Sequence, residues 1–158
     1  MDAAYWIEHL NLTAHPEGGF YRETYRSTGM LKHEGSGWSR NFSTAIYFLL
    51  RHQDRSMFHR IRSDELWHFH SGGRLTLYTL TAGGLVTQTL GQEVKLGDSL
   101  QVVIPANHWF GAMITDGPYV LASCTVSPGF DFNDFEIASR RDLLIAFPHH
   151  SDIIQQLT

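Results

Sequence analysis

The stretch Ser56–Gly73 reads SMFHRIRSDELWHFHSGG and contains three histidines, two acids, two arginines and one tryptophan. No other segment of the sequence has this density of groups that bind a ligand or move a proton. Its pattern is typical of a strand, a turn, a second strand and a glycine turn. We therefore expect it to form one wall of a pocket inside a small β-barrel.

Short strand patterns dominate the rest of the chain. The predicted strands are 20–27, 42–50, 58–61, 66–70, 75–80, 85–90, 99–104, 109–114 and 119–125. Glycine- and proline-bearing turns separate them, including Gly72-Gly73 and Asp116-Gly117-Pro118. Many short strands with such punctuation favour an all-β sandwich or barrel over alternating βα units.

Helices are expected only at the two ends of the chain. Residues 2–10 carry apolar side chains at helical spacing, and Asp2 is a candidate N-cap. Residues 143–146 and 152–157 are predicted as short C-terminal helices. The polar, glycine-bearing segment 29–39 is interpreted as a mobile loop.

Composition excludes several classes of function. At 158 residues the chain is expected to form one domain over residues 1–158. A formal charge of -4 argues against nucleic acid as a partner. No apolar run approaches the ~20 residues that span a membrane, and no signal peptide is visible. The single cysteine, Cys124, fits a reducing compartment, so we expect a cytoplasmic protein without a membrane partner.

Strand parity decides which side chains of the opening stretch face the pocket. In a strand, successive side chains point to opposite faces. Glu65, Trp67 and Phe69 therefore share one face. His68 and His70 share the opposite face, where we expect them to form hydrogen bonds outside the pocket or at an interface. These two histidines are not expected to join Glu65 around one metal ion.

The spacing of His59, Glu65 and Gly72, followed by Gly97-Asp98 and Pro105-Ala106-Asn107, resembles the two motifs of the cupin superfamily. The strings HPEGGFYRETYRS at 15–27 and SPGFDF at 127–132 resemble its DUF985, or Cupin_5, subfamily in particular. The resemblance covers nearly the whole chain. It implies an all-β cupin double-stranded β-helix, or jelly roll, with short terminal helices, a pocket in the barrel mouth and a homodimer.

The sequence departs from the metal-binding cupins at two positions. His59 and Glu65 match two of the family's metal ligands, but Ile61 and Phe110 stand where two further histidines would be. His108 lies two residues before the motif position. A catalytic zinc-type site usually needs three protein ligands. We therefore expect neither a bound metal nor another cofactor.

A metal-free pocket would use the remaining inward residues. We predict His59 and Glu65 as catalytic residues, a base and its orienting partner. Arg22 is predicted to clamp a carboxylate or phosphate, with an ion pair elsewhere as the alternative. The other predicted ligand-binding residues are Tyr21, a candidate proton donor, and the aromatic residues Trp67, Phe69 and Phe110; for Trp67 the alternative is a place in the core.

Together these features predict a cupin that binds a small polar or anionic metabolite. The same pocket suits a metal-independent isomerase or epimerase-like enzyme acting through His59 with Glu65. Two alternatives stay open from the sequence. One is a metal-dependent cupin enzyme, such as a dioxygenase or isomerase; the other is a non-catalytic, storage-like cupin dimer.

Overall fold

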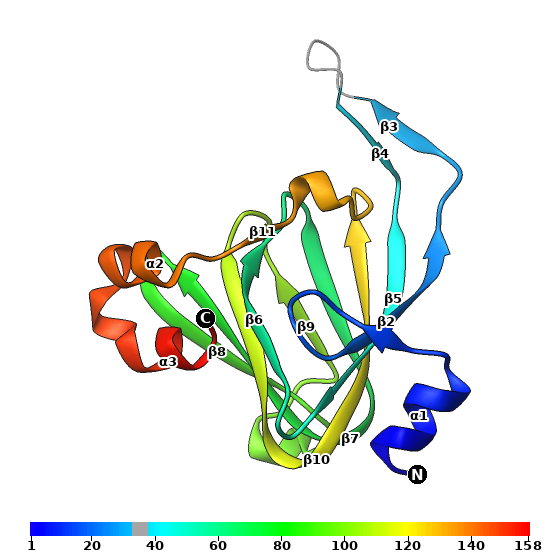
Figure 1. The fold of residues 1–158 in the computed structure, drawn as a ribbon, viewed down its shortest axis with the longest axis horizontal. Helices are drawn as coiled ribbons and strands as arrows, with labels where there is room; N and C mark the ends of the chain where they lie inside the picture. The colour runs from blue at the N-terminus through cyan, green and yellow to red at the C-terminus, as the bar shows by residue number, and fades with distance from the viewer. Residues whose placement is uncertain (33–37) are drawn as a thin grey trace.

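A computed structural model describes residues 1–32 and 38–158 as a curled antiparallel barrel with helices at its ends (Figure 1). The helices and 3-10 turns are α1 (Ala3–His9), η1 (Val94–Leu96), η2 (Phe132–Asp134), α2 (Arg140–Ala146), η3 (Pro148–His150) and α3 (Ser151–Gln156). The strands are β1 (Thr13–Ala14), β2 (Phe20–Arg26), β3 (Met30–Lys32), β4 (Ser39–Asn41), β5 (Thr44–Arg51), β6 (Arg55–Arg60), β7 (Asp64–Thr81), β8 (Gly84–Leu90), β9 (Gln101–Ile104), β10 (Trp109–Ser127) and β11 (Glu136–Ile137).

The main sheet runs in the order β1-β2-β5-β10-β6-β11, and β7 pairs with β8, β9 and β10. All the strand pairs in it are antiparallel. This arrangement confirms the all-β, jelly-roll class that the sequence indicated. No helix of the described chain has the length and apolar character that a membrane crossing requires.

Two long strands, β7 and β10, form the frame of the barrel. The sequence predicted a turn at Gly72-Gly73 and another at Asp116-Gly117-Pro118, but both segments lie inside continuous strands. The strands pair with each other along most of their length, and the register shifts where these segments meet. A Cβ atom on Gly73 would lie 2.0 Å from the carbonyl oxygen of Asp116, so the glycine allows the backbones to touch at a shared corner.

The region predicted as a mobile loop, 29–39, is only partly described. At its two ends β3 and β4 pair with each other, Met30 opposite Asn41 and Lys32 opposite Ser39, so these ends are strand and the prediction was wrong there. Figure 1 shows this pair projecting beyond the barrel. Residues 33–37 lie outside the described residues.

The hydrophobic core fills the inside of the barrel. Its largest fully buried side chains include Trp67, Phe48 and Phe110, each 2% exposed or less. Full burial of one large apolar side chain contributes about 1.5–3 kcal/mol to the free energy of unfolding. These side chains therefore pack the interior of the barrel and stabilise it.

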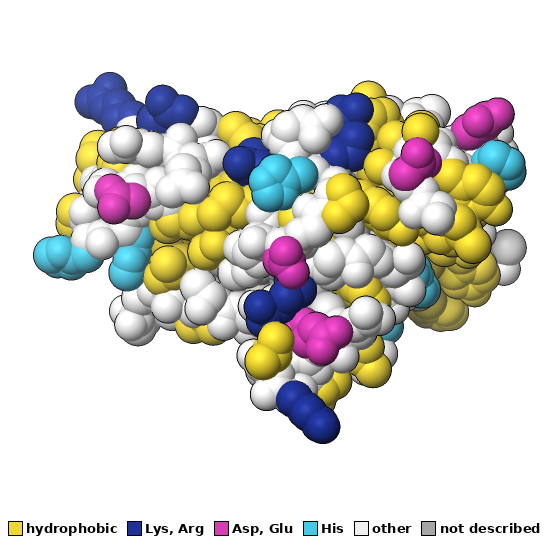
Figure 2. Space-filling view, turned by 90° about the horizontal axis from the view of Figure 1, so that it is seen from below, with side chains coloured by type: hydrophobic (Ala, Val, Ile, Leu, Met, Phe, Trp, Pro, Cys, Tyr) yellow, Lys and Arg dark blue, Asp and Glu magenta, His cyan; other side chains and the backbone are white. Residues whose placement is uncertain are grey.

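The terminal helices cover apolar surface outside the barrel, and the apolar face predicted for residues 2–10 is confirmed in α1. Asp2 caps α1 by accepting a hydrogen bond from the backbone N–H of Tyr5 at 2.9 Å. Helices α2 and α3 bury Leu143 and Ile154 against Phe58. Figure 2 shows one outer face of the molecule, on which charged side chains of both signs are scattered without a single-sign patch.

Candidate functional site

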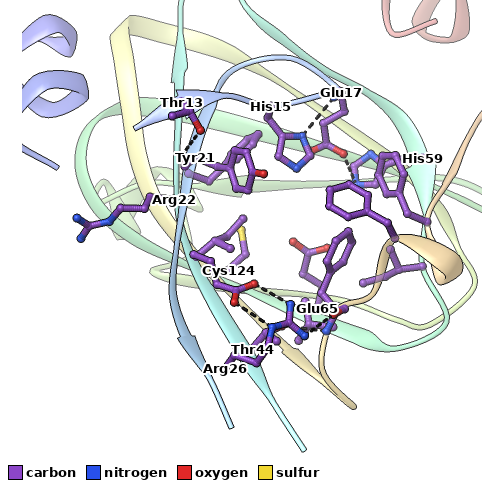
Figure 3. Close-up of a pocket in the computed structure, with 18 of the residues that line it drawn as sticks. Thr13, His15, Glu17, Tyr21, Arg22, Arg26, Thr44, His59, Glu65 and Cys124 are labelled. Carbon is purple, nitrogen blue, oxygen red and sulfur yellow. Dashed lines mark hydrogen bonds and ion pairs between the residues drawn. The ribbon is translucent and has the colours of Figure 1, made fainter. Parts of the chain in front are cut away.

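The barrel contains a cavity of about 240 Å³, which is lined by residues of β2, β5 and the segment 130–135, among others (Figure 3). Aromatic rings form much of its wall, and titratable side chains point into it. The residues that line it are Asn11, Thr13, His15, Glu17, Tyr21, Arg22, Glu23, Arg26, Thr44, Ile46, Phe48, His59, Ile61, Glu65, Trp67, Cys124, Val126, Phe130, Phe132 and Phe135.

The loop between β1 and β2 places Glu17 against strand β6 of the barrel wall. Gly18 has φ +108°, and a Cβ atom there would lie 2.0 Å from the carbonyl oxygen of Arg55. Glycine is therefore required for the loop to approach β6 so closely. The carbonyl of Glu17 accepts the N–H of Met57 at 3.1 Å, and its Oε1 accepts the hydroxyl of Ser56 at 2.9 Å.

Glu17 is the charged partner of His59. Nε2 of His59 lies 2.9 Å from Oε2 of Glu17, and their side chains are 4% and 5% exposed. Nδ1 of His59 lies 2.7 Å from the carbonyl oxygen of Met57. Because a neutral imidazole has only one N–H, acceptors at both nitrogens indicate the doubly protonated, cationic ring.

The pKa shifts of this pair agree with that assignment. Burial alone would lower the pKa of His59, but the charge and contact of Glu17 outweigh it, and the pKa is raised above its ordinary value. Burial would raise the pKa of Glu17, but the charge and hydrogen bond of His59, together with His15 and Ser56, outweigh burial and lower the pKa. The pair is therefore a buried ion pair at neutral pH.

His15 lies beside this ion pair and is in its neutral form. Its Nδ1 accepts the backbone N–H of Glu17 at 3.2 Å, which leaves the proton on Nε2. Burial is the main reason that the pKa of His15 is lowered. The ring packs edge-on against Tyr21 with 4.6 Å between centroids.

Glu65, on β7, lies near the ion pair of Glu17 and His59. It is 7% exposed, and burial raises the pKa of its carboxyl group to about 7, although the charge of His59 opposes the shift. The thiol of Cys124 is the group in hydrogen-bond contact with it, and burial raises the pKa of that thiol well above its ordinary value. Near neutral pH, Glu65 therefore exists in both protonated and ionised forms.

The structure brings some of the predicted site residues together and separates others. His59, Glu65, Trp67 and Tyr21 all line the cavity. Arg22 borders it, but Figure 3 shows its side chain pointing away. Its guanidinium carbon lies 5.8 Å from the ring centroid of Tyr47.

Two predicted wall residues lie outside the cavity lining. Phe110 packs behind the imidazole of His59, with 4.2 Å between ring centroids. Phe69 packs against the main core, four residues and roughly 13 Å along β7 from Glu65. The outward direction predicted for His68 and His70 is confirmed, since they bond to the hydroxyls of Thr125 and Ser123 on the outer face.

His15 and Glu17 are functional candidates that the sequence reasoning did not identify. In the sequence, the segment HPEGG contributes only to the string 15–27 that resembles the DUF985 subfamily. Nothing in the local pattern shows that it reaches β6, far along the chain. The same holds for Phe130 and Phe135, which also line the cavity and were not predicted as site residues.

The donor set does not fit a metal of the usual cupin type. In the described parts of the chain, no group of three or more His, Cys, Asp or Glu side chains is placed to hold an ion. Both nitrogens of His59 face acceptors, so neither lone pair is directed to a metal. His108 does not line the cavity, and its Nδ1 lies 3.0 Å from the carbonyl oxygen of Ala106.

A curled antiparallel barrel with a pocket at one end is the architecture of the cupins. The chain belongs to a family of that superfamily: the family model "Cupin superfamily (DUF985)" matches residues 4–138. Among curated proteins, the uncharacterised protein YML079W of Saccharomyces cerevisiae is 29% identical over 154 residues, which cover 87% of this chain and 76% of that protein.

Solved structures agree with this assignment. A hypothetical protein from Leishmania major is 34% identical with a TM-score of 0.94, covering 100% of this chain and 99% of that one. Protein SO0799 of Shewanella oneidensis is 40% identical with a TM-score of 0.90, covering 100% and 98%. Oxalate decarboxylase of Bacillus subtilis, 12% identical with a TM-score of 0.56 over 92% of this chain and 36% of that one, shares the fold alone.

Proposed function

We propose that this cupin binds a small metabolite in the barrel cavity and that Glu65 exchanges a proton with it in a metal-independent, isomerase- or epimerase-like reaction. One observation carries the proposal. Glu65 is a buried carboxyl group on the cavity wall with a pKa of about 7. A general acid or base works best when its pKa lies near the operating pH.

The surrounding groups supply what proton abstraction beside a carbonyl requires. In such a reaction negative charge develops on the carbonyl oxygen, and fixed hydrogen-bond donors stabilise it. Nε2–H of His15 and Nε1–H of Trp67 are donors on the cavity wall that bond to no residue in 1–32 or 38–158. They are the candidates for that role.

The ion pair of Glu17 and His59 has a different role in this proposal from the one the sequence suggested. Both nitrogens of His59 are engaged, so the imidazole is not a free base. It instead fixes a positive charge near Glu65, which favours the ionised form of that carboxyl group. His59 is therefore a positioning residue, and Glu65 is the group that meets the ligand.

Ligand-dependent stabilisation tests the binding step. A panel of sugar nucleotides, organic acids and amines is screened for an increase in melting temperature. A ligand at 100 times its dissociation constant adds ~2.7 kcal/mol to the free energy of unfolding. The variant Glu65→Gln should weaken or abolish the shift given by a hit, whereas the exposed Glu8→Gln should keep it. A panel without any hit would contradict the binding proposal.

Solvent exchange tests the proton transfer. Any hit with a C–H bond beside a carbonyl is incubated with the protein in D₂O, and loss of that proton signal is followed by NMR. We expect exchange with the wild-type protein and none with Glu65→Gln. Equal exchange rates in both would show that another group moves the proton.

We also propose that the chain acts as a single cupin domain, residues 1–158, within a cytoplasmic homodimer. The family resemblance supports the dimer, and the single cysteine supports a reducing compartment. Sedimentation velocity at several protein concentrations tests the dimer. A monomer at all of them would contradict it.

A further inference from the structure

Two cationic groups at the cavity, His59 and Arg26, are already engaged by partners within the protein. Arg22 forms no ion pair with residues 1–32 or 38–158, but Figure 3 shows its side chain pointing away from the cavity. His59 directs both ring nitrogens at acceptors, one of them the carboxylate of Glu17. Arg26 at the cavity mouth donates twice to the carboxylate of Glu23 and also bonds Asn41 and the carbonyl of Phe130. His59 or Arg26 would therefore have to give up one of these contacts to bind an anionic ligand.

The acidic groups, in contrast, keep unused acceptor capacity. Oε2 of Glu17 has the ion-pair contact with His59 but accepts no further hydrogen bond from residues 1–32 or 38–158. A carboxylate oxygen has two lone-pair positions, so one remains available. Glu65 faces the same space and contacts only the weakly donating thiol of Cys124 within the described chain.

We propose that the cavity selects a compact ligand with a cationic, N–H-bearing head group, such as an amine, an amidinium or a protonated heteroaromatic ring. The head group donates to the free position on Oε2 of Glu17 and to the carboxylate of Glu65. This deepens the proposed function and rests on it, and it differs from the anionic option within the polar or anionic ligand that the sequence suggested.

The walls fit the rest of such a ligand. The rings of Tyr21, Trp67 and Phe135 line the same cavity as these two carboxylates. Aromatic faces attract an organic cation and pack well against a flat apolar body. Aromatic rings that surround free carboxylates differ from the usual design of an anion site, which presents unpaired Arg, Lys or backbone N–H groups.

Binding of a cationic ligand should depend on pH, because the ligand competes with the proton of Glu65. The groups that face Glu65 from neighbouring elements are His59 on β6, Glu17 on the β1–β2 loop and Cys124 on β10. A cation that binds the ionised carboxylate competes with its proton. With the pKa of Glu65 at about 7 in the free protein, affinity should rise about tenfold between pH 6 and pH 8. An anionic ligand would show the opposite trend.

Three probes with the same ring and different head groups test the proposal on the full chain. Benzamidine carries an amidinium cation, benzamide a neutral amide and benzoate an anion. Dissociation constants are measured by NMR chemical-shift titration at pH 6, 7 and 8. We expect benzamidine to bind most tightly, with affinity that increases with pH, and Glu65→Gln to remove that increase. Glu8→Gln, an exposed carboxylate on α1, is the matched control and should behave as the wild type.

The outcomes separate this inference from the function on which it rests. Tighter binding of benzoate than of benzamidine would overturn the cationic head group and leave the binding pocket standing. A benzamidine affinity that is independent of pH, or unchanged in Glu65→Gln, would also overturn it. If no probe binds, the inference fails, and the metabolite panel then decides separately whether the cavity binds any ligand.

Discussion

Nε2 of His59, in strand β6, lies 2.9 Å from Oε2 of Glu17, in the loop between β1 and β2. Both side chains are buried, so this contact is an ion pair removed from water. It attaches the loop to the barrel wall, and it engages the imidazole that the sequence suggested as a base. The pKa of each of these two cavity residues is shifted by the charge of the other.

The first prediction concerns the stability that this pair provides. His59→Gln leaves the Glu17 carboxylate buried beside a neutral group. The loss of one partner from a buried ion pair usually costs about 3–5 kcal/mol of the free energy of unfolding. Equilibrium denaturation in urea at pH 7 measures the change.

A double-mutant cycle provides the control. Glu17→Gln combined with His59→Gln should cost less than the sum of the two single changes, because neither charge is then left alone. His149→Gln, an exposed histidine before α3, should change the free energy by less than about 0.5 kcal/mol. Additive costs at Glu17 and His59 would mean that the two side chains do not interact.

The second prediction is a pH dependence of stability caused by Glu65. The folded-state pKa of about 7 lies above the ordinary value of 4.5, so between these values the folded protein binds more protons than the unfolded chain. Stability contributed by the protonated carboxyl is therefore present below about pH 4.5 and is lost as pH rises through 7, by up to about 3 kcal/mol.

Comparison with Glu65→Gln isolates this contribution. The neutral side chain does not titrate, so the stability difference between the variant and the wild type should grow in favour of the variant from pH 5 to pH 8. Thermal unfolding across this range measures it, with Glu8→Gln as the exposed control. A difference that stays constant with pH would show that Glu65 is ionised throughout.

The third prediction concerns the corner that β7 and β10 share. Gly73→Ala places a methyl group 2.0 Å from the carbonyl oxygen of Asp116, a backbone atom that cannot move alone. We expect a loss of about 3 kcal/mol or more in the free energy of unfolding. Gly83→Ala is the matched control, because its Cβ would meet only the hydroxyl of Thr81 at 3.7 Å. Equal stability of the two variants would argue against the close approach of the strands.

The fourth prediction separates ligand binding from folding at Tyr21. Its ring lines the cavity, and its hydroxyl bonds to no residue in the described part of the chain. Tyr21→Phe should therefore leave the free energy of unfolding within about 0.5 kcal/mol of the wild type. The same change should weaken any ligand found in the panel that accepts or donates a bond at this position. Tyr25→Phe, 56% exposed, is the control that should change neither property.

Much of the fold could be predicted from local patterns. The apolar run 42–50 and the segment 99–104 were predicted as strands and contain most of β5 and all of β9, and Asp2 marks the start of α1. The corner at Gly72-Gly73 was misjudged because a glycine pair in a turn and a glycine pair under a crossing strand look the same in sequence. Only the carbonyl of Asp116 above Gly73 distinguishes them, and it comes from another strand.

By itself, the sequence determined the barrel class, the inward direction of Glu65 and Trp67, and the outward direction of His68 and His70. Side-chain parity in a strand is a local property, so no distant contact was needed. Only the tertiary structure decided which charges meet. The loop that carries Glu17 folds onto β6 and neutralises His59, while burial leaves Glu65 with a pKa of about 7. Such properties depend on distance and desolvation between segments that lie far apart in the chain.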